Sequence, residues 1–501
     1  EDTGRRGLYF DKKEYSGAEI PSFEAYRDKL PQPVLDDNKE LVELYWKAWE
    51  LAFKHMKKPP KGSPFVSNYF DAASAPNVFQ WDTIFMIMFS RYGEDIFPSV
   101  QSLDNFYSRQ YENGYICREI QESDGQDYVY KGRDNTVNTP LYGWAEIGIY
   151  KLTGDKSRFA RVIPVLEKLA GWLGKYRRKE NTKHNLYWQT GLGSGMDNTP
   201  QSGSGWVCLS TQMEMLYDNL SFMCKETGRG KEADLYASKA KDIGERINKF
   251  MWNEEDGLYY NLDDEGNQIK AKTAACFWPM FAGLCDLHKA EKLMANLKDP
   301  KSFWRPMPFP TLAADQKGYK PEGAYWLGSV WAPTNIMIIK GLDQFSFDDN
   351  NYDSYAFRKF GAYASEKYLE AMYDVYKKTG TIWENYSSEF SMPGFPANLD
   401  FVGWSGCGPV MLLIENVLGI HADALKNEIT WDLDRIDTNG IKDLKFGGVT
   451  TTLISQKRNA LNSPAVLTIE SDKPYSLRVF KWDKKSKTFE IKKGINNITV
   501  E

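Results

Sequence analysis

Apolar residues recur every three to four positions through most of the chain, from Asp36 to about His421. This spacing follows the 3.6-residue turn of an α-helix, and the first stretch begins after Asp36 and Asp37, which are suitable helix caps. Its apolar stripe is formed by Leu41, Leu44, Tyr45, Ala48, Trp49, Ala52 and Met56. The pattern predicts twelve helices, over residues 37–57, 81–92, 94–111, 139–153, 155–178, 209–227, 230–251, 273–285, 287–297, 328–342, 353–378 and 404–418.

Three of these predicted helices end in the same way. Lys151–Gly154, Lys225–Gly228 and Lys377–Gly380 each place a lysine in the last turn and a glycine after it. Glycine is favoured there because this C-terminal cap needs a left-handed backbone. The three ends recur at spacings of about 75 and 150 residues, which is compatible with a repeat of helical hairpins and equally with chance similarity of helix ends.

The predicted helices are of two kinds. Residues 330–339 are apolar nearly all round, as in a helix buried on every side, whereas residues 353–378 carry many lysines and glutamates on one side, as in an outer, amphipathic helix. Twelve helices in successive hairpins predict a mainly α fold, the six-hairpin (α/α)6 toroid. The wide loops at one end of such a ring would form a pocket.

After about residue 427 the apolar period changes from that of a helix to two, which is typical of half-buried strands. Pairs of residues that favour turns, Asn439-Gly440 and Gly447-Gly448 among them, separate the runs. The alternating apolar positions are Ala465, Leu467 and Ile469 in one run and Tyr475, Leu477 and Val479 in another. The sequence thus predicts an N-terminal extension (1–35), a catalytic toroid (36–424) and a small C-terminal β-sandwich (425–501).

Composition narrows the classes of function. The 501 residues carry a net charge of -5, which gives no reason to expect nucleic acid or an anionic membrane as a partner. The longest apolar run, Ile84–Phe89, is far too short to span a membrane. Aromatic residues make up 14% of the chain, and their flat rings serve both as core and as platforms for sugar rings. Because the chain begins at Glu1 without a methionine, we expect an exported protein, periplasmic or secreted, whose signal has been removed.

Cysteine and histidine usage excludes further chemistry. The six cysteines form no Cys-x-x-Cys pair, so we expect buried free thiols rather than a zinc ribbon or a disulfide framework. The four histidines are far apart, and no zinc-peptidase, phosphate-loop or dinucleotide motif is present. We therefore expect no metal and no cofactor. The acidic pairs Asp263-Asp264 and Asp348-Asp349 resemble hairpin tips or helix starts, and their spacing does not favour calcium. Carboxylates remain as the candidate catalysts.

Two loops hold an acidic residue among glycines and aromatic residues. Asp197 lies in residues 191–200, where three glycines let the backbone approach a ligand, and Glu384 follows a predicted helix end in residues 380–389. A carboxylic acid in a dry pocket can donate a proton while a second carboxylate takes one from water, which is the chemistry of glycoside hydrolysis. The alternatives are a turn or helix-cap residue for Asp197 and a surface charge for Glu384. Glu322 and Glu389 are lesser candidates, and Glu389 is a rival for the base.

Six short segments between residues 65 and 420 resemble, in order, motifs of the inverting α-glycosidases of glycoside hydrolase family 63 and of their relatives, the family 37 trehalases and the bacterial mannosylglycerate hydrolases. Ser194–Asn198 is similar to the loop of the general acid, and Trp383–Tyr386 to the loop of the general base. The other four segments resemble motifs on the substrate side: Phe79–Thr83, Gly114–Ile120, Tyr325–Trp331 and Gly403–Gly406.

This resemblance implies an inverting, exo-acting glycoside hydrolase, α-glucosidase-like, whose substrate is an α-linked oligosaccharide. Asp197 would protonate the leaving group, and Glu384 would activate water on the opposite face. The resemblance implies that the other site residues bind the substrate, the tryptophans by stacking: Trp81, Trp326, Trp331, Trp404, Asp82, Arg118 and Glu119. For the tryptophans a place in the core is the alternative, and for Asp82 a helix cap.

Two other functions stay open at this point. One is an epimerase or lyase on the same toroid, which usually needs histidine or tyrosine for proton transfer, and the other is a carbohydrate-binding protein without activity. The chain also departs from the motifs of the families that it resembles. Leu327 and Gln201 stand at positions where those families usually have arginine, and Cys208 stands near a position where they usually have aspartate. Neither leucine nor glutamine offers the rigid set of hydrogen-bond donors of an arginine. We therefore expect that the protein is not a trehalase, unless Arg118 or Arg133 places its guanidinium where those arginines would lie.

Overall fold

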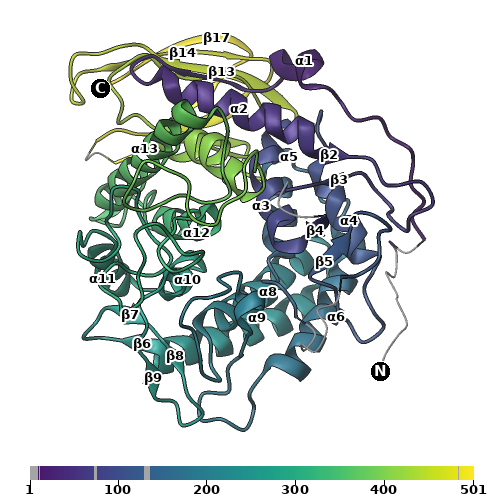
Figure 1. Cartoon of the computed structure of the whole chain (residues 1–501). Coiled ribbons are helices and arrows are strands. Elements are labelled where there is room, and N and C mark those ends of the chain that lie inside the picture. Colours follow the sequence, from purple (N-terminus) through teal and green to yellow (C-terminus); the bar gives the residue numbers. More distant parts are fainter. Residues whose placement is uncertain (1–9, 11, 73–75, 129–135, 483–484) are drawn as a thin grey trace.

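In the computed structural model, which describes residues 10, 12–72, 76–128, 136–482 and 485–501, helices follow one another around a ring, and the C-terminal strands pack on one side of it (Figure 1). The α-helices are α1 (Phe23–Tyr26), α2 (Lys39–His55), α3 (Gln80–Ser90), α4 (Ser102–Tyr107), α5 (Tyr142–Thr153), α6 (Phe159–Arg177), α7 (Gly191–Ser194), α8 (Val207–Glu226), α9 (Gly230–Arg246), α10 (Trp278–Phe281), α11 (Leu287–Leu297), α12 (Ala332–Asp343) and α13 (Ser354–Thr379).

An inner layer of helices closes the ring. Helices α3, α5, α8, α10 and α12 contact one another in turn, and the last helical segment, Trp404–Val417, contacts both α12 and α3. Every residue of α3 and of Trp404–Val417 is buried, whereas α9 is buried at only a few positions along one side. The prediction is confirmed for the two segments that it named, because residues 330–339 are all buried and α13 is buried along one side.

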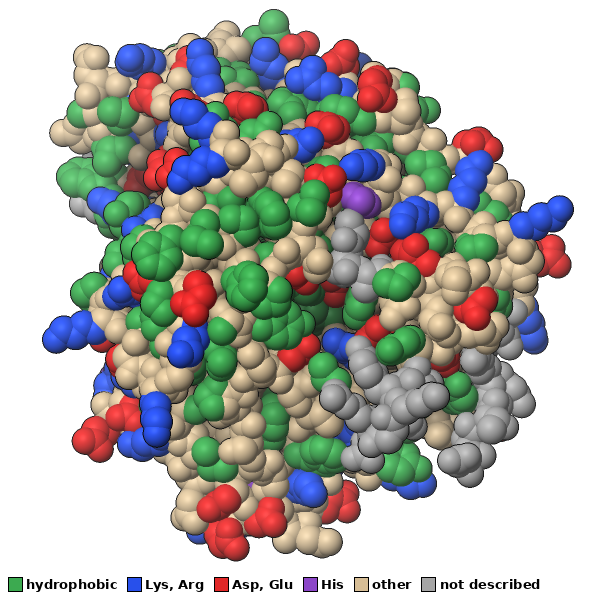
Figure 2. All heavy atoms as spheres, viewed as in Figure 1, with side chains coloured by type: hydrophobic (Ala, Val, Ile, Leu, Met, Phe, Trp, Pro, Cys, Tyr) green, Lys and Arg blue, Asp and Glu red, His purple; other side chains and the backbone are tan. Residues whose placement is uncertain are grey.

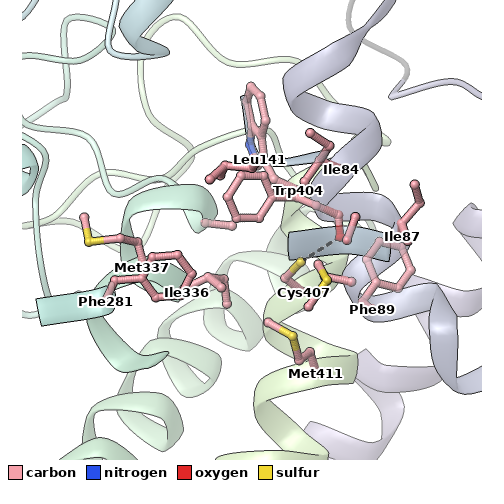
Figure 3. Packing of buried hydrophobic residues seen from close by; sticks show 14 of the residues in the cluster. Ile84, Ile87, Phe89, Leu141, Phe281, Ile336, Met337, Trp404, Cys407 and Met411 are labelled. Carbon is pink, nitrogen blue, oxygen red and sulfur yellow. Dashed lines mark hydrogen bonds between the residues drawn. The ribbon is translucent and has the colours of Figure 1, made fainter. Parts of the chain in front are cut away.

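The core at the centre of the ring is apolar and joins segments far apart in sequence. Figure 3 shows Trp404, Cys407 and Met411 lying between the side chains of α3 and those of α12. All six cysteines are buried and free, as the sequence predicted. This packing fixes the inner helices relative to one another, so the loops at their ends are held on a rigid base.

Several predicted helix ends are confirmed, and two predicted helices are shorter than expected. Helix α11 has the predicted bounds, and Gly154, Gly228 and Gly380 have left-handed φ angles of 76°, 77° and 74°. Within 94–111 only α4 is α-helical, because Pro98 has no N–H to continue a helix. Within 273–285 the chain makes a 3-10 turn and then the four residues of α10.

The C-terminal strands form two sheets that contact each other. The five-stranded sheet has the order β1-β12-β13-β14-β17 and the four-stranded sheet the order β10-β11-β15-β16. Rings of Phe446 and Tyr475 meet between the two sheets with centroids 5.4 Å apart. The strands are β1 (Gln32–Leu35), β10 (Ile420–Asp423), β11 (Glu428–Asp432), β12 (Asn439–Phe446), β13 (Val449–Ser455), β14 (Ala465–Ser471), β15 (Tyr475–Phe480), β16 (Lys487–Ile491) and β17 (Gly494–Val500).

The alternation read from the sequence is confirmed in β14, where every second side chain is buried. Gly447-Gly448 makes the predicted turn with left-handed φ angles, but Asn439-Gly440 begins strand β12 instead of turning. Strand β1 comes from the N-terminal extension, and β10 begins at Ile420, ahead of the predicted boundary. The sheets are tied to the ring by the buried ion pair of Arg358 in α13 with Asp432, at 3.1 Å.

Four short strand pairs brace the loops of the ring: β2 (Met56–Lys57) with β3 (Tyr69–Phe70), β4 (Asn77–Phe79) with β5 (Glu119–Gln121), β6 (Trp252–Asn253) with β7 (Leu258–Tyr259), and β8 (Asn261–Leu262) with β9 (Gln268–Ile269). The β4–β5 pair brings the start of α3 beside Arg118 and Glu119. Within the described ranges, the helices are too short or too polar to cross a membrane.

Candidate active site

A cavity of about 290 Å³ opens among the loops at one end of the ring. Most of its wall comes from segments that lie at the start of, or before, an inner helix: the start of α3, the residues before α5, α8 and α12, and the loop before Trp404. Arg118, directly before β5, is the exception. Figure 2 shows the face of the ring hollowed near its middle, with hydrophobic side chains beside the hollow. The lining residues are Phe79, Trp81, Asp82, Arg118, Asn138, Gly195, Asp197, Tyr325, Trp326, Glu384, Pro396, Ala397, Asn398 and Trp404.

Asp197 lies on this wall, two residues after a glycine that the local geometry requires. Gly195 has a left-handed φ of 75°, and a Cβ there would meet the ring of Trp81 at 3.0 Å. The hydroxyl of Tyr325 donates to Oδ2 of Asp197 at 3.1 Å. Burial raises the pKa of Asp197, although the charge of Arg118 and the hydrogen bond from Tyr325 act in the opposite direction. This carboxyl group is thus suited to hold and donate a proton.

Glu384 faces the same cavity and is only 8% exposed, so it is not a surface charge. Asn398 donates to Oε2 of Glu384 twice, from its backbone N at 3.1 Å and from its Nδ2 at 2.9 Å. Burial raises the pKa of Glu384 to about 7, and the charge of Asp197 adds to this while the hydrogen bonds from Asn398 oppose it. A carboxyl group with such a pKa can take a proton from water near neutral pH.

A third carboxyl group, that of Asp82, completes the acidic part of the wall. Asp82 lies inside the first turn of α3, and the N-cap residue is Phe79, so the alternative of a helix cap is wrong. Its side chain is 3% exposed, and burial, together with the charge of Glu384, raises its pKa well above the usual range. Asp82 therefore favours a protonated form that can donate to a sugar hydroxyl.

Arg118 lines the cavity, but its neighbour Glu119 lies behind it. Glu119 is 1% exposed, contacts the guanidinium of Arg118 and accepts a hydrogen bond from Nδ2 of Asn77 at 2.8 Å. Glu119 therefore orients Arg118 from outside the cavity, whereas the sequence predicted that it binds substrate.

Of the four predicted tryptophans, Trp326, Trp331 and Trp404 form one cluster of rings and Trp81 lies apart from it, and three of the four, all but Trp331, line the cavity. Trp331 is 0% exposed and stacks behind Trp326, with ring centroids 3.8 Å apart and an interplanar angle of 9°. It therefore supports Trp326 and cannot stack on a sugar itself. Trp404 donates its indole N–H to the backbone oxygen of Glu384 at 2.8 Å, so it also holds the loop of Glu384 in place.

The rival carboxylates lie outside the cavity wall. Glu389 makes two hydrogen bonds with Arg305, at 2.6 and 2.9 Å, and accepts one from Tyr319 at 2.6 Å. Burial acts to raise its pKa, but these partners outweigh burial and the pKa is lowered. Glu322 is exposed and does not line the cavity. Of the predicted candidates for the base, the structure therefore places only Glu384 in the cavity.

Sequence reasoning assigned no role to two polar residues of the wall, Asn138 and Asn398. Asn138 is 6% exposed, and within the described part of the chain its Oδ1 has no hydrogen-bond partner. Gln189 and Gln80 hold the backbone on either side of it through Val137 and Thr139, at 3.1 and 2.9 Å. Neither asparagine is part of a recognisable motif, so only the fold could reveal them.

The residues that differ from the motifs of the resembled families do not line the cavity. Leu327 and Gln201 lie outside it, Cys208 is buried in α8, and Arg133 falls outside the described residues. Among the residues that the structure describes, no histidine lines the cavity, and no cluster of three metal-ligating side chains occurs. The site is therefore built around carboxyl groups, tryptophans, one arginine and two asparagines.

Comparison with known proteins identifies the kind of domain. Residues 75–391 match the family described as the mannosylglycerate hydrolase MGH1-like glycoside hydrolase domain, and this range includes Asp197 and Glu384. An uncharacterised protein of Borreliella burgdorferi is 26% identical over 447 residues, covering 85% of this chain and 89% of the relative.

Solved structures share the fold at low identity. A GH63 mannosylglycerate hydrolase from Thermus thermophilus, solved with glucose, has a TM-score of 0.57 and 18% identity, covering 74% of this chain and 99% of that one. A structure described as a sialidase has a TM-score of 0.67 and 16% identity, covering 98% of this chain and 42% of the other. An α-L-rhamnosidase from Streptomyces avermitilis, solved with L-rhamnose, has a TM-score of 0.56 and 13% identity, covering 94% and 42%.

Proposed function

Because the chain belongs to the family of mannosylglycerate hydrolase MGH1-like glycoside hydrolase domains, and is thus a glycoside hydrolase, we propose that it cleaves a terminal α-linked sugar with inversion at the anomeric carbon. Asp197 is the general acid in this proposal and Glu384 the general base. The observation that carries it is the meeting, in one cavity, of two buried carboxyl groups from loops far apart in sequence, each with its own set of partners.

The proposed reaction needs one proton donor and one acceptor. Asp197 gives its proton to the glycosidic oxygen as the bond from this oxygen to the anomeric carbon breaks, and the bonding electrons leave with the departing alcohol. Water attacks the anomeric carbon from the opposite face, and Glu384 takes the proton that this water loses. Tyr325 stabilises the Asp197 carboxylate that forms, because its hydroxyl already donates to Oδ2.

The size and lining of the cavity favour a single sugar ring, as in exo action. A volume of about 290 Å³ is at the lower end of the range for ligand sites. Trp81, Trp326 and Trp404 offer flat apolar surface for a sugar face, and Asp82, Arg118 and Asn138 offer hydrogen-bonding groups for hydroxyls. The resemblance to family 63 favours an α-glucosidase-like substrate.

We extend the proposal to the scaffold, a toroid of six helical hairpins. The pairs are α2 with α3, α4 with α5, α6 with α8, α9 with α10, α11 with α12, and α13 with Trp404–Val417. In each pair the second member belongs to the inner layer that closes the ring. This order explains why most of the wall of the cavity consists of segments at or before the starts of inner helices.

The test is hydrolysis of a panel of aryl α-glycosides and α-linked disaccharides, read out as released reducing sugar. Turnover of at least one compound, with hydrolysis of α-linked disaccharides lost in Asp197→Asn, supports the proposal. Sugar binding without any turnover would instead favour the second candidate, a carbohydrate-binding protein that keeps the ring and its aromatic residues. Formation of an unsaturated or epimerised sugar would favour a lyase or an epimerase.

A further inference from the structure

A short segment lies between the loop of the proposed base and the loop that holds Tyr325, the hydrogen-bond partner of the proposed acid. The segment Gly394–Leu399, called here the 394–399 strap, runs beside Glu322–Tyr325 on one side and beside Trp383–Asn385 on the other. On the first side, N of Phe395 donates to O of Glu322, and N of Tyr325 donates to O of Phe395, both at 3.0 Å. On the second side, N of Gly394 donates to O of Asn385 at 3.0 Å, and Leu399 pairs with Trp383.

Asn398 lies where the strap meets the proposed base. Its backbone oxygen accepts from N of Glu384 at 2.9 Å, and its backbone N and Nδ2 both donate to Oε2 of Glu384. These contacts fix both the backbone and one carboxylate oxygen of Glu384. Within the described residues no hydrogen bond ends on the other oxygen, Oε1, and Glu384 lines the cavity.

The other edge of the strap reaches the proposed acid through Tyr325. Ala324 and Tyr325 both have left-handed φ angles, 40° and 69°, which residues other than glycine adopt only when their surroundings impose them. The hydrogen bond from N of Tyr325 to Phe395 is one such constraint, and the hydroxyl of the same Tyr325 donates to Asp197. The strap thus contacts partners of both carboxyl groups.

We propose that Asn398 is a positioning residue of the active site, which fixes Oε2 of Glu384 so that Oε1 is presented to the attacking water, while the 394–399 strap sets the base relative to the acid. This inference rests on the proposed role of Glu384 as base. The side chain of Asn398 itself transfers no proton, because its amide group stays neutral and donates a hydrogen bond to Glu384 through Nδ2.

The charges around Glu384 show what Asn398 must counter. Asp197 faces the same cavity and repels a negative charge on Glu384, and the charge of Glu384 in turn keeps Asp82 protonated. Tyr325 is a neutral donor to Asp197, and Arg118 is the cation of the described wall. Burial acts in the same direction as the charge of Asp197. The two hydrogen bonds from Asn398 stabilise the carboxylate, which is the form that can accept a proton from water.

The experiment measures the ionisation of Glu384 directly. Protein labelled with ¹³C at the glutamate carboxyl carbons is titrated by NMR, and the signal of Glu384 is assigned from its loss in Glu384→Gln. We expect Asn398→Ala to raise the pKa of Glu384 by about one unit, because one of two donors is lost. Asn398→Asp, which places a further negative charge beside the carboxylate, is expected to raise it more. Asn398 is exposed, so both variants should fold.

Kinetics supply the second readout and separate two possible failures. In Asn398→Ala, kcat should fall about tenfold or more with a smaller change in KM, and the acidic limb of the pH profile should move to higher pH. Leu399→Ala, on the same strap but with an exposed side chain, is the matched control and should keep the wild-type titration. An unchanged Glu384 titration in both Asn398 variants would overturn the positioning role. A wild-type protein that hydrolyses no glycoside would overturn the proposed function, whatever the titration shows.

Discussion

The hydroxyl of Tyr325 and Oδ2 of Asp197 are joined by a hydrogen bond of 3.1 Å between residues that are 128 positions apart in sequence. Burial raises the pKa of Asp197 and so favours the protonated acid, whereas the hydrogen bond from Tyr325 favours the carboxylate. A general acid benefits from both effects. It must hold its proton before the reaction, and its anion must be stabilised once the proton has gone to the leaving group.

The first prediction concerns the catalytic pair. With an α-linked disaccharide as substrate, Asp197→Asn and Glu384→Gln should each lower kcat by about 10²–10⁴-fold or more, because each removes one proton-transfer step, while thermal melts stay near wild type. The matched control is Glu389→Gln, since Glu389 is bound to Arg305 and Tyr319 outside the cavity. It should keep most of the turnover. If either Asp197→Asn or Glu384→Gln kept near-normal activity, the substituted residue would have no catalytic role.

The second prediction concerns pH. In Asp197→Asn, an aryl glycoside with a good leaving group needs no general acid, so kcat/KM depends on Glu384 alone. Activity should rise with pH as Glu384 loses its proton, because only the carboxylate accepts a proton from water. The midpoint should lie below about 7, since the charge of Asp197 no longer raises the pKa of Glu384. A rate that does not change with pH, or a midpoint above that of the wild-type group, would contradict the assignment of Glu384.

The candidate site shows which features a sequence can specify. Asp197 and Glu384 were predictable because glycine and aromatic neighbours give their loops a recognisable composition, and the resemblance assigned their roles. Trp331 and Trp326 could not be told apart, because both belong to one motif and only the stacking of their rings decides which one faces the cavity. The sequence could not predict Asn398, because its contact with Glu384 depends on how the 394–399 strap packs against the loop of Glu384.

In the fold, too, the features set by neighbouring residues were predictable from the sequence, and those set by contacts between distant segments were not. Helix bounds were predicted well where a capping residue stands directly before the apolar stripe. An example is Leu287–Leu297, which is capped by the side chain of Asp286. The pairing of Gln32–Leu35 with the strand Asn439–Phe446 was beyond reach, because it joins opposite ends of the chain through backbone hydrogen bonds. Such pairings depend on tertiary structure rather than on local propensity.

The third prediction is stereochemical. Inversion requires room for a water molecule between Glu384 and the anomeric carbon, so the two carboxyl groups should be about 6.5–9.5 Å apart when substrate is bound. The first sugar released from an α-linked substrate should be the β-anomer, which proton NMR on a fresh reaction mixture can follow before mutarotation. Initial release of the α-anomer would exclude both inversion and the role of Glu384 as base.

The fourth prediction concerns stability and a buried charge cluster that links inner helices. Glu415 accepts hydrogen bonds from Arg91 and Tyr92, each at 2.5 Å, and pairs with Lys340 at 2.7 Å. Burial alone would raise its pKa, but Lys340 and Arg91 lower it strongly. Glu415→Gln should therefore cost about 3–5 kcal/mol of unfolding free energy at neutral pH, since Arg91 loses its buried partner and Lys340 keeps only Asp343 as an ion-pair partner.

The pH dependence of this cost follows from the direction of the shift. The pKa of Glu415 is lower in the folded than in the unfolded state, so its contribution is complete above the unfolded value of about 4.3 and is lost as pH falls toward the folded value. Urea unfolding should show the gap between wild type and variant narrowing below about pH 4. The control is Glu254→Gln, whose exposed partners are Lys292 and His288, and it should change stability little. A gap that stays constant with pH would contradict the ionised state of Glu415.

The fifth prediction is that trehalose is a poor substrate. Arg118 is the arginine that lines the described cavity wall, and Leu327 and Gln201 contribute no side chain to that wall. An arginine offers five hydrogen-bond donors in a fixed geometry. A second sugar that is bound through its hydroxyl groups would therefore bind much more weakly where such arginines are missing. A site that lacks donors for the second sugar binds that part of the transition state weakly, which lowers kcat/KM. The measurement compares kcat/KM for trehalose with that for α-glucosides, α-mannosides and α-galactosides that carry other leaving groups. If trehalose had the highest value of the panel, other side chains would have to supply the missing donors, and the interpretation of Leu327 and Gln201 as determinants of specificity would be wrong.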